Sequence, residues 1–257
     1  MRPIRSLILL CLCCLVAGLP ACKRDKEVRR ELEQAKLDAV RAETPQLFDP
    51  EWQIPPTPEV YIAWVRTTKG ACWIEVHRDW APNAADQFWR LTNSSYYSQM
   101  PIYRALKGRL IQWGIHVKPE ISAIWKDRCF EPDPMLKSNL EGYAGIAPDP
   151  SMGNKLSTQV YINLSDNFHL DEQGFVPFGR VLRGLDRMRQ VYSGYDEVAQ
   201  YGNQAGVDMT LAWESGVRYL RKTFPKLDLV KSTVLKPEYG TESEDGQDEG
   251  DDEAGGR

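Results

Sequence analysis

The residues most able to do chemistry lie between Pro101 and Gly114. Apolar and polar side chains alternate there, which predicts two short strands joined at Lys107-Gly108, with Arg104 and Gln112 facing one surface. A guanidinium on the apolar face of a strand is costly to bury unless it is paired or has a task. The alternative is an arginine on an edge strand whose charged head reaches water.

Short strands are expected to hold this hairpin in place. The alternation puts Ile102 and Leu106 beside Arg104 and turns Tyr103 to the opposite face. Other strands are expected at residues 60–66, 72–76, 143–146, 159–164, 176–182 and 227–235, helices at 81–93, 184–192 and 210–223, and loops at 115–140 and 193–209. Many short strands with few helices predict a mainly β fold, a closed barrel with helices at its ends.

The N-terminal residues 1–21 have the pattern of a secretory signal peptide. Arg2 and Arg5 precede an apolar run that is too short to span a membrane. The run leads into Leu19-Pro20-Ala21-Cys22, which resembles a bacterial lipobox and implies cleavage before Cys22 and lipidation of that residue. Because Lys23 follows, we expect a protein of the bacterial cell envelope, anchored by lipid to the outer membrane and facing the periplasm. The alternative is an ordinary signal peptide cut nearby.

The residues that follow are expected to hold a domain away from the membrane. Residues 23–45 are highly charged, which predicts a solvated helical stalk, and residues 46–58 are rich in proline, which predicts a stiff linker. Stalk and linker thus take up residues 22–58. The folded domain is expected over residues 59–235.

The C-terminal residues 236–257 are predicted to form a disordered acidic tail. Residues 238–257 hold nine acidic residues against one arginine, and they have no aliphatic side chain larger than alanine. Residues 22–237 hold 29 basic and 27 acidic residues, a net charge of +2. A body so close to neutral lacks the basic footprint of a nucleic-acid-binding protein, so no nucleic-acid partner is expected.

The cysteines and histidines do not form a metal-binding pattern. Cys72 and Cys129 are the cysteines left after removal of the signal peptide and acylation of Cys22. They could form a disulfide or remain two buried thiols, because the sequence does not give their separation. His77, His116 and His169 lack the spacing of metal ligands, so no metal site is expected.

Several motifs taken together resemble the cyclophilin family of peptidyl-prolyl cis-trans isomerases. They are Thr67–Gly70 with Asp79–Pro82, Ile102–Gly114, Ser157–Ile162, Leu170–Asp186 and Gly216–Asp228. The resemblance covers residues 59–235, in order. It implies a closed eight-stranded antiparallel barrel with the site on its outer face, no cofactor, and binding of X-Pro segments. We expect a monomer.

The resemblance also implies roles for individual residues. Arg104 would donate a hydrogen bond to the prolyl nitrogen of the twisted amide, and Gln112 would fix Arg104 and the substrate carbonyl. The other substrate-binding positions line the proline pocket or border the groove: Tyr103, Leu110, Ala147, Gln159, Tyr161, His169 and Leu170.

Some residues depart from the family pattern. Arg109 stands where a phenylalanine usually walls the pocket, Tyr103 replaces a histidine, and Trp113 replaces a glycine. Because Arg104 and Gln112 are retained, the first hypothesis is an isomerase that assists the folding of exported proteins. The second is a catalytically weak or inactive lipoprotein that binds proline peptides or acts as a chaperone. A purely structural surface lipoprotein is a third.

Overall fold

A computed structural model describes residues 21–236 of the chain. The predicted acidic tail, apart from Lys236, and the predicted signal peptide, apart from Ala21, lie outside the described residues. Cys22, the predicted lipidation site, falls in the first turn of helix α2 (Ala21–Glu43).

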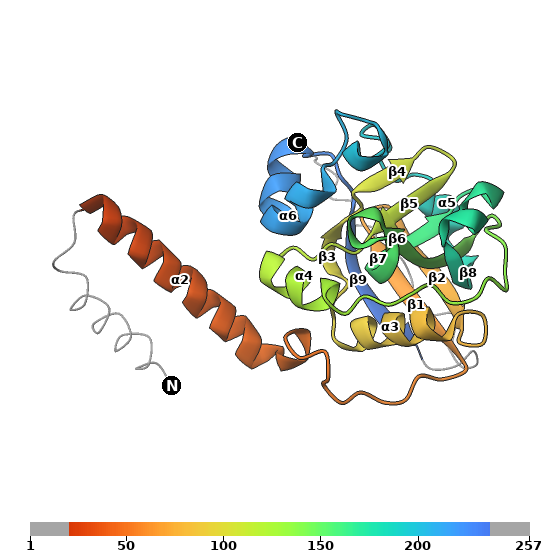
Figure 1. The fold of residues 1–257 in the computed structure, drawn as a ribbon, viewed down its shortest axis with the longest axis horizontal. Coiled ribbons are helices and arrows are strands. Elements are labelled where there is room, and N and C mark those ends of the chain that lie inside the picture. Colours follow the sequence, from red (N-terminus) through yellow and green to blue (C-terminus); the bar gives the residue numbers. More distant parts are fainter. Residues whose placement is uncertain (1–20, 237–257) are drawn as a thin grey trace, which may run out of the picture.

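One antiparallel sheet of nine strands forms the body of the protein (Figure 1), in the order β3-β9-β1-β2-β8-β6-β7-β5-β4. The strands are β1 (Val60–Thr67), β2 (Gly70–His77), β3 (Ser98–Pro101), β4 (Arg104–Leu106), β5 (Leu110–Trp113), β6 (Tyr143–Asp149), β7 (Lys155–Asn163), β8 (Val176–Arg183) and β9 (Leu229–Lys236). Every pairing between neighbours is antiparallel. The predicted mainly β, antiparallel class is therefore confirmed.

The sheet has nine strands where eight in a closed barrel were predicted. The additional strand, β3, arises because the extended run from Ser98 to Leu106 is broken at Ile102 and Tyr103. Before the break the chain pairs with β9, and after it with β5. The two edges of the curled sheet are therefore joined by the chain itself.

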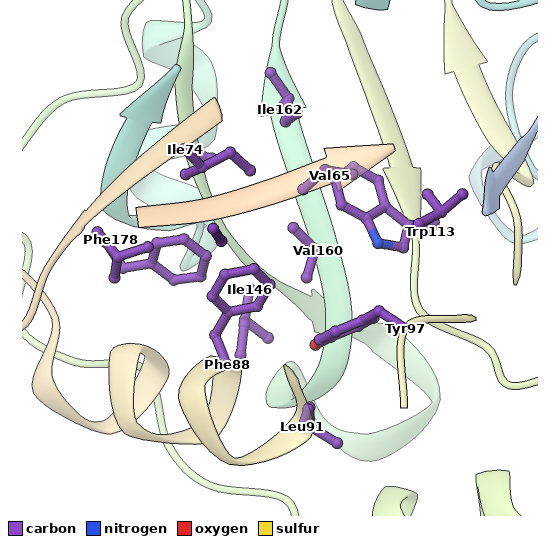
Figure 2. Close-up of a cluster of buried hydrophobic side chains, with 14 of the residues drawn as sticks. Val65, Ile74, Phe88, Leu91, Tyr97, Trp113, Ile146, Val160, Ile162 and Phe178 are labelled. Atoms are coloured by element: carbon purple, nitrogen blue, oxygen red, sulfur yellow. The ribbon is translucent and has the colours of Figure 1, made fainter. Parts of the chain in front are cut away.

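The core lies inside the curl of the sheet and is covered at one end by helix α3 (Pro82–Asn93). Val65 and Ile74 point inward from β1 and β2 and are fully buried, as period-two alternation requires (Figure 2). Phe88 of α3 stacks on Phe178 of β8 with ring centroids 5.0 Å apart. Trp113 also points into this core, so its departure from the family pattern is a matter of packing.

The remaining helices agree in part with the predictions. They are α4 (Pro119–Lys126), α5 (Leu185–Met188) and α6 (Met209–Thr223), with 3₁₀ turns η1 (Pro45–Leu47), η2 (Pro150–Met152), η3 (Phe168–Gln173) and η4 (Ala199–Tyr201). The helix predicted at 210–223 is confirmed by α6, whereas α5 is shorter than predicted. The prediction of a loop throughout 115–140 is wrong, because α4 starts at Pro119 and buries Ile121 and Trp125 on one face.

Helix α2 occupies most of the predicted stalk and projects away from the sheet (Figure 1). The proline-rich residues after it lie against the body instead of forming a free spacer. The Trp125 indole donates to the carbonyl of Leu47 at 2.8 Å, and the Trp89 indole donates to that of Pro55 at 2.8 Å. Within residues 21–236, no helix combines the length and the apolar character needed to cross a membrane.

The two cysteines left open by the sequence are both free thiols. Cys72 is fully buried in β2, whereas Cys129 is half-buried in the segment after α4. Burial raises the pKa of the Cys72 thiol to about 12, so this group stays protonated and packs as a small apolar side chain.

Candidate active site

The hairpin predicted around Arg104 is confirmed by the pairing of β4 with β5. Arg104 lies directly opposite Gln112, and Leu106 lies opposite Leu110. Gly108 takes a left-handed conformation with φ of 69°, which lets the chain reverse over a short turn. The cross-strand register puts the two side chains on one face, where Nη1 of Arg104 donates to Oε1 of Gln112 at 3.0 Å.

Tyr103 lies on the same side as Arg104 and Gln112, so the prediction that it faces the opposite way is wrong. Period-two alternation does not apply to Tyr103, because this residue falls in the break between β3 and β4. Its hydroxyl oxygen accepts a hydrogen bond from Nε2 of Gln112 at 2.7 Å. Ile102, predicted to lie beside Arg104, enters the main core instead.

A buried chain of hydrogen bonds continues from Gln112 into the protein. Nε2 of Gln112 also donates to Oε1 of Gln159 at 2.9 Å, and the Tyr103 hydroxyl donates to the same oxygen. Nε2 of Gln159 then donates to Oδ2 of Asp149 at 2.8 Å, which also accepts from the Trp213 indole at 3.2 Å. Each of these contacts fixes which way an amide group points, so the oxygen of Gln112 is turned toward Arg104.

The Tyr103 hydroxyl stays protonated and remains available as a donor. Burial raises the pKa of Tyr103 well above its ordinary value, and the negative charge of Asp149 raises it further. Asp149 and Trp213 were not expected at the site. They come from the end of β6 and from α6, and they meet only through folding.

Four residues that were predicted to line the proline pocket or border the groove lie in one apolar cluster next to this network, together with Leu106 and Phe175. Its members are Leu106, Leu110, Ala147, Tyr161, Leu170 and Phe175. None has more than 4% of its surface exposed, so their side chains pack against one another and offer little surface to a ligand in this conformation. The Tyr161 hydroxyl donates to Oδ1 of Asn139 at 2.8 Å, which satisfies this polar group within the cluster.

Arg109 lies at the surface beside the cluster and not within it. Its side chain is exposed, and its Nη2 lies 3.0 Å from Nε2 of His169, which is also exposed. No ion pair formed by residues 21–236 includes Arg109. The site therefore has a cation at its edge, where a wall of the pocket was predicted.

Residues 195–207 cover Arg104 and were predicted only as part of an irregular loop. Oε1 of Glu197 accepts from Nε of Arg104 at 2.5 Å, and Oε2 accepts from Nη2 at 2.7 Å. The guanidinium carbon of Arg104 lies 4.7 Å from the centroid of the Tyr201 ring. These contacts leave 7% of the Arg104 side chain exposed. Glu197 is 93 positions away in the sequence, so no local pattern could have revealed it.

Comparisons with known proteins agree on one family. A family model described as cyclophilin type peptidyl-prolyl cis-trans isomerase/CLD matches residues 62–207. Peptidyl-prolyl cis-trans isomerase 10 of Caenorhabditis elegans is 29% identical over 131 residues, which cover 49% of this chain and 79% of that protein. Peptidyl-prolyl cis-trans isomerase-like 3 of Mus musculus is 28% identical over 131 residues, with the same shares of 49% and 79%.

Two solved structures of a cyclophilin type peptidyl-prolyl cis-trans isomerase from Cryptosporidium parvum are similar to this chain. The first has a TM-score of 0.47 and 18% identity, and it covers 70% of this chain and 99% of that one. The second, obtained in the presence of the dipeptide Ala-Pro, has a TM-score of 0.48 and 19% identity, with shares of 69% and 99%.

Proposed function

Since the chain belongs to the family of cyclophilin type peptidyl-prolyl cis-trans isomerases, we propose that it isomerises X-Pro peptide bonds with Arg104 as the catalytic donor. The observation that carries this proposal is the placement of Arg104. It stands on a short strand, directly across from Gln112, and Gln112 is itself held by Tyr103 and Gln159. A donor fixed in this way needs little reorganisation when it acts.

The reaction has to overcome the loss of amide resonance. Rotation about a prolyl peptide bond has a barrier of about 20 kcal/mol, because the bond loses its partial double-bond character in the twisted state. In that state the prolyl nitrogen regains its lone pair and becomes a better acceptor. A guanidinium that donates to this nitrogen therefore binds the transition state more strongly than either planar form, which is the condition for acceleration.

The neighbours of Arg104 provide the surroundings that the reaction needs. Leu106 follows two residues later on β4, on the same face, and belongs to the apolar cluster. An apolar surface favours the twisted amide, because water stabilises the more polar planar form. Gln112 and Tyr103 are positioning residues, since they fix the guanidinium through hydrogen bonds.

The substrates that we propose are X-Pro segments of unfolded or partly folded exported proteins. This part of the proposal is supported by residues 1–22 of the sequence, where the signal peptide and lipobox pattern occur. Lipid attached to Cys22 would anchor the protein in the bacterial cell envelope, with the domain facing the periplasm. Metabolic labelling with a radioactive fatty acid tests the anchor. Labelling of the wild type that Cys22→Ser abolishes supports it, and labelling that persists refutes Cys22 as the site.

Exchange NMR on a short X-Pro peptide tests the enzymatic proposal. The mature chain, from residue 22 onward, should accelerate cis–trans exchange, and Arg104→Ala should remove most of the acceleration. Arg180→Ala is a matched control, because it deletes a guanidinium that pairs with Glu75 on the outer face of β8. Equal exchange rates with and without the wild-type protein would refute the proposal.

A second candidate function is a binding module with little or no turnover. It is favoured by the ion pair between Arg104 and Glu197 and by the closed packing of the apolar cluster. This function predicts shifted peptide resonances or suppressed aggregation of unfolded clients, without faster exchange. The same titration therefore separates the two functions.

A further inference from the structure

We propose that Glu197 gates Arg104, by occupying the donors that an X-Pro segment would use and swinging aside when such a segment binds. The inference rests on the proposed role of Arg104, and it concerns the affinity with which that residue binds substrate. It makes Glu197 an internal competitor of the substrate. The affinity of the site is then set by how often the Glu197 side chain leaves.

The contacts on Arg104 show what a substrate would have to displace. Glu197 takes up Nε and Nη2 through two charge-assisted hydrogen bonds of 2.5 and 2.7 Å. Nη1 donates to Gln112. All three guanidinium nitrogens are thus engaged, and the Tyr201 ring lies over the group at 4.7 Å. These contacts use three of the five N–H donors, and with the Tyr201 ring they leave only 7% of the Arg104 side chain exposed, so a prolyl amide reaches the guanidinium only when Glu197 or Tyr201 moves aside.

The backbone around Glu197 is held on both sides of the residue. Asp196 forms an isolated bridge with Ala105 on the open edge of β4. Val198 is completely buried, in a cluster that also contains Val207 and Trp213. A loop fixed at neighbouring positions in this way does not swing as a lid.

The far side of the loop is equally constrained. The side-chain amide of Asn203 donates to the carbonyl oxygens of both Tyr195 and Glu197, at 3.0 and 3.1 Å. A Cβ atom at Gly206 would lie 1.8 Å from the carbonyl oxygen of Glu197, so the chain packs tightly there. The backbone of Glu197 is therefore held in place on both sides of the loop.

The side chains that form the gate can move without the backbone. The Glu197 side chain is 21% exposed and Tyr201 is 41% exposed, so both reach solvent. Rotation about their side-chain bonds would place the carboxylate and the ring in water and uncover Arg104, and it would also break the hydrogen bond that the backbone N–H of Val198 donates to Oε1 of Glu197 at 2.9 Å. Because rotation of Glu197 breaks two charge-assisted hydrogen bonds to Arg104, the covered form of the gate is the favoured one. The gate acts on the equilibrium between covered and uncovered Arg104.

Glu197→Gln is the variant that tests the gate. It keeps the length and shape of the side chain and one acceptor oxygen, and it removes the charge. If the uncovered form is the minor one, the apparent affinity falls by the fraction uncovered. We expect Glu197→Gln to lower KM for the blocked peptide acetyl-Ala-Ala-Pro-Ala-amide about tenfold and to leave kcat within about twofold. Asp196→Asn is the matched control, and it should leave both constants unchanged. It alters the neighbouring carboxylate, and Asn tolerates the positive φ of 54° at that position.

The division between KM and kcat separates a gate from a positioning residue. If Glu197 holds Arg104 in its active orientation, Glu197→Gln lowers kcat and leaves KM unchanged, and the proposal is overturned. If Asp196→Asn matches the effect of Glu197→Gln, the change comes from the overall charge of the loop, and the proposal is overturned as well.

A binding measurement keeps the gate separate from the isomerase proposal. Should the wild-type protein show no acceleration, the enzymatic function fails, but titration of the same peptide by NMR still reports affinity. Binding about tenfold tighter to Glu197→Gln than to wild type supports the gate in a protein that only binds. Equal affinities refute it. In either case, the double variant Arg104→Ala/Glu197→Gln should not show the tighter peptide binding of Glu197→Gln, and tighter binding that persists refutes the gate.

Discussion

Tyr103→Phe tests whether the buried hydrogen bonds behind Arg104 matter for catalysis. The change removes one oxygen and leaves the ring, so the packing of the site should be unaltered. That oxygen accepts from Gln112 and donates to Gln159. Nε2 of Gln112 keeps its bond to Oε1 of Gln159 at 2.9 Å, so neither partner is left without a hydrogen bond.

The magnitude follows from this count of partners. Stranding a buried polar group costs about 1–3 kcal/mol, whereas losing one bond from a group that retains another costs about 1 kcal/mol. We therefore expect Tyr103→Phe to lower the free energy of unfolding by about 1 kcal/mol and Tm by about 2–4 °C. Gln112 becomes freer to rotate, so kcat should fall about threefold, with KM nearly unchanged.

Tyr61→Phe is the matched control for this measurement. Its hydroxyl is buried as well and donates to the carbonyl oxygen of Ala85 at 2.7 Å, in α3 and away from the site. Chemical denaturation should show a similar loss of stability in both variants, and exchange NMR should show a loss of kcat only in Tyr103→Phe. An unchanged kcat in Tyr103→Phe would refute the view that the network positions the guanidinium. A fall in stability above about 3 kcal/mol would refute the count of partners.

Three further predictions concern charge, pH and backbone conformation. Arg109 is an exposed cation without an ion-pair partner among residues 21–236. A peptide with Glu near its proline should therefore bind up to about fivefold more tightly at low salt than the same peptide with Gln at that position. Arg109→Ala should abolish this preference, and a preference that survives would contradict the role of Arg109. Burial lowers the pKa of His116 from 6.5 to about 4, and its Nδ1 accepts from the backbone N–H of Lys118 at 3.1 Å. Between these two pH values the unfolded chain binds a proton at His116 that the folded chain excludes, so the free energy of unfolding present above about pH 6.5 should fall by about 3 kcal/mol toward pH 4. Denaturation of His116→Gln over the same pH range gives the background, and the difference between the two proteins isolates this loss. Equal pH dependence in the two proteins would contradict it. Gly216→Ala should lower the free energy of unfolding by more than 1 kcal/mol, because φ is +54° at this residue and a Cβ would lie 2.6 Å from the carbonyl oxygen of Val117. An unchanged denaturation midpoint would contradict the expected backbone strain.

Features set by neighbouring residues could be predicted from the sequence. The hairpin of β4 and β5 depends on alternation and on a turn at Gly108, and α6 depends on a periodic apolar face. The break at Ile102 and Tyr103 could not be foreseen, because it follows from pairing β3 with β9, which lies near the other end of the domain. Helix α4 was missed because prolines dominate its surroundings, although Pro119 at its first turn is a helix-start signal.

The composition of the site divides along the same line. Arg104 and Gln112 were predicted because they belong to one local motif, and four predicted pocket residues do meet in one cluster. Glu197 and Asp149 were not predicted, since their proximity to the motif depends on the path of the chain over more than 30 residues. The closed state of the cluster depends on packing between five different segments, which no local pattern specifies.

The two carboxylates at the ends of the network explain how a guanidinium can be buried in this fold. The Arg104 side chain is nearly buried, and an unpaired charge there would strongly destabilise the protein, so the ion pair with Glu197 stabilises the resting protein. When a neutral X-Pro segment replaces Glu197, that compensation is lost, and the other carboxylate of the network, the buried Asp149, is linked to Arg104 through Gln159 and Gln112. The same pair therefore stabilises the fold and weakens substrate binding. It follows that Glu197→Gln should be less stable than wild type and should bind substrate more tightly. Stability and substrate affinity oppose each other here, because the guanidinium that the fold pairs with Glu197 is the one that function requires to be free.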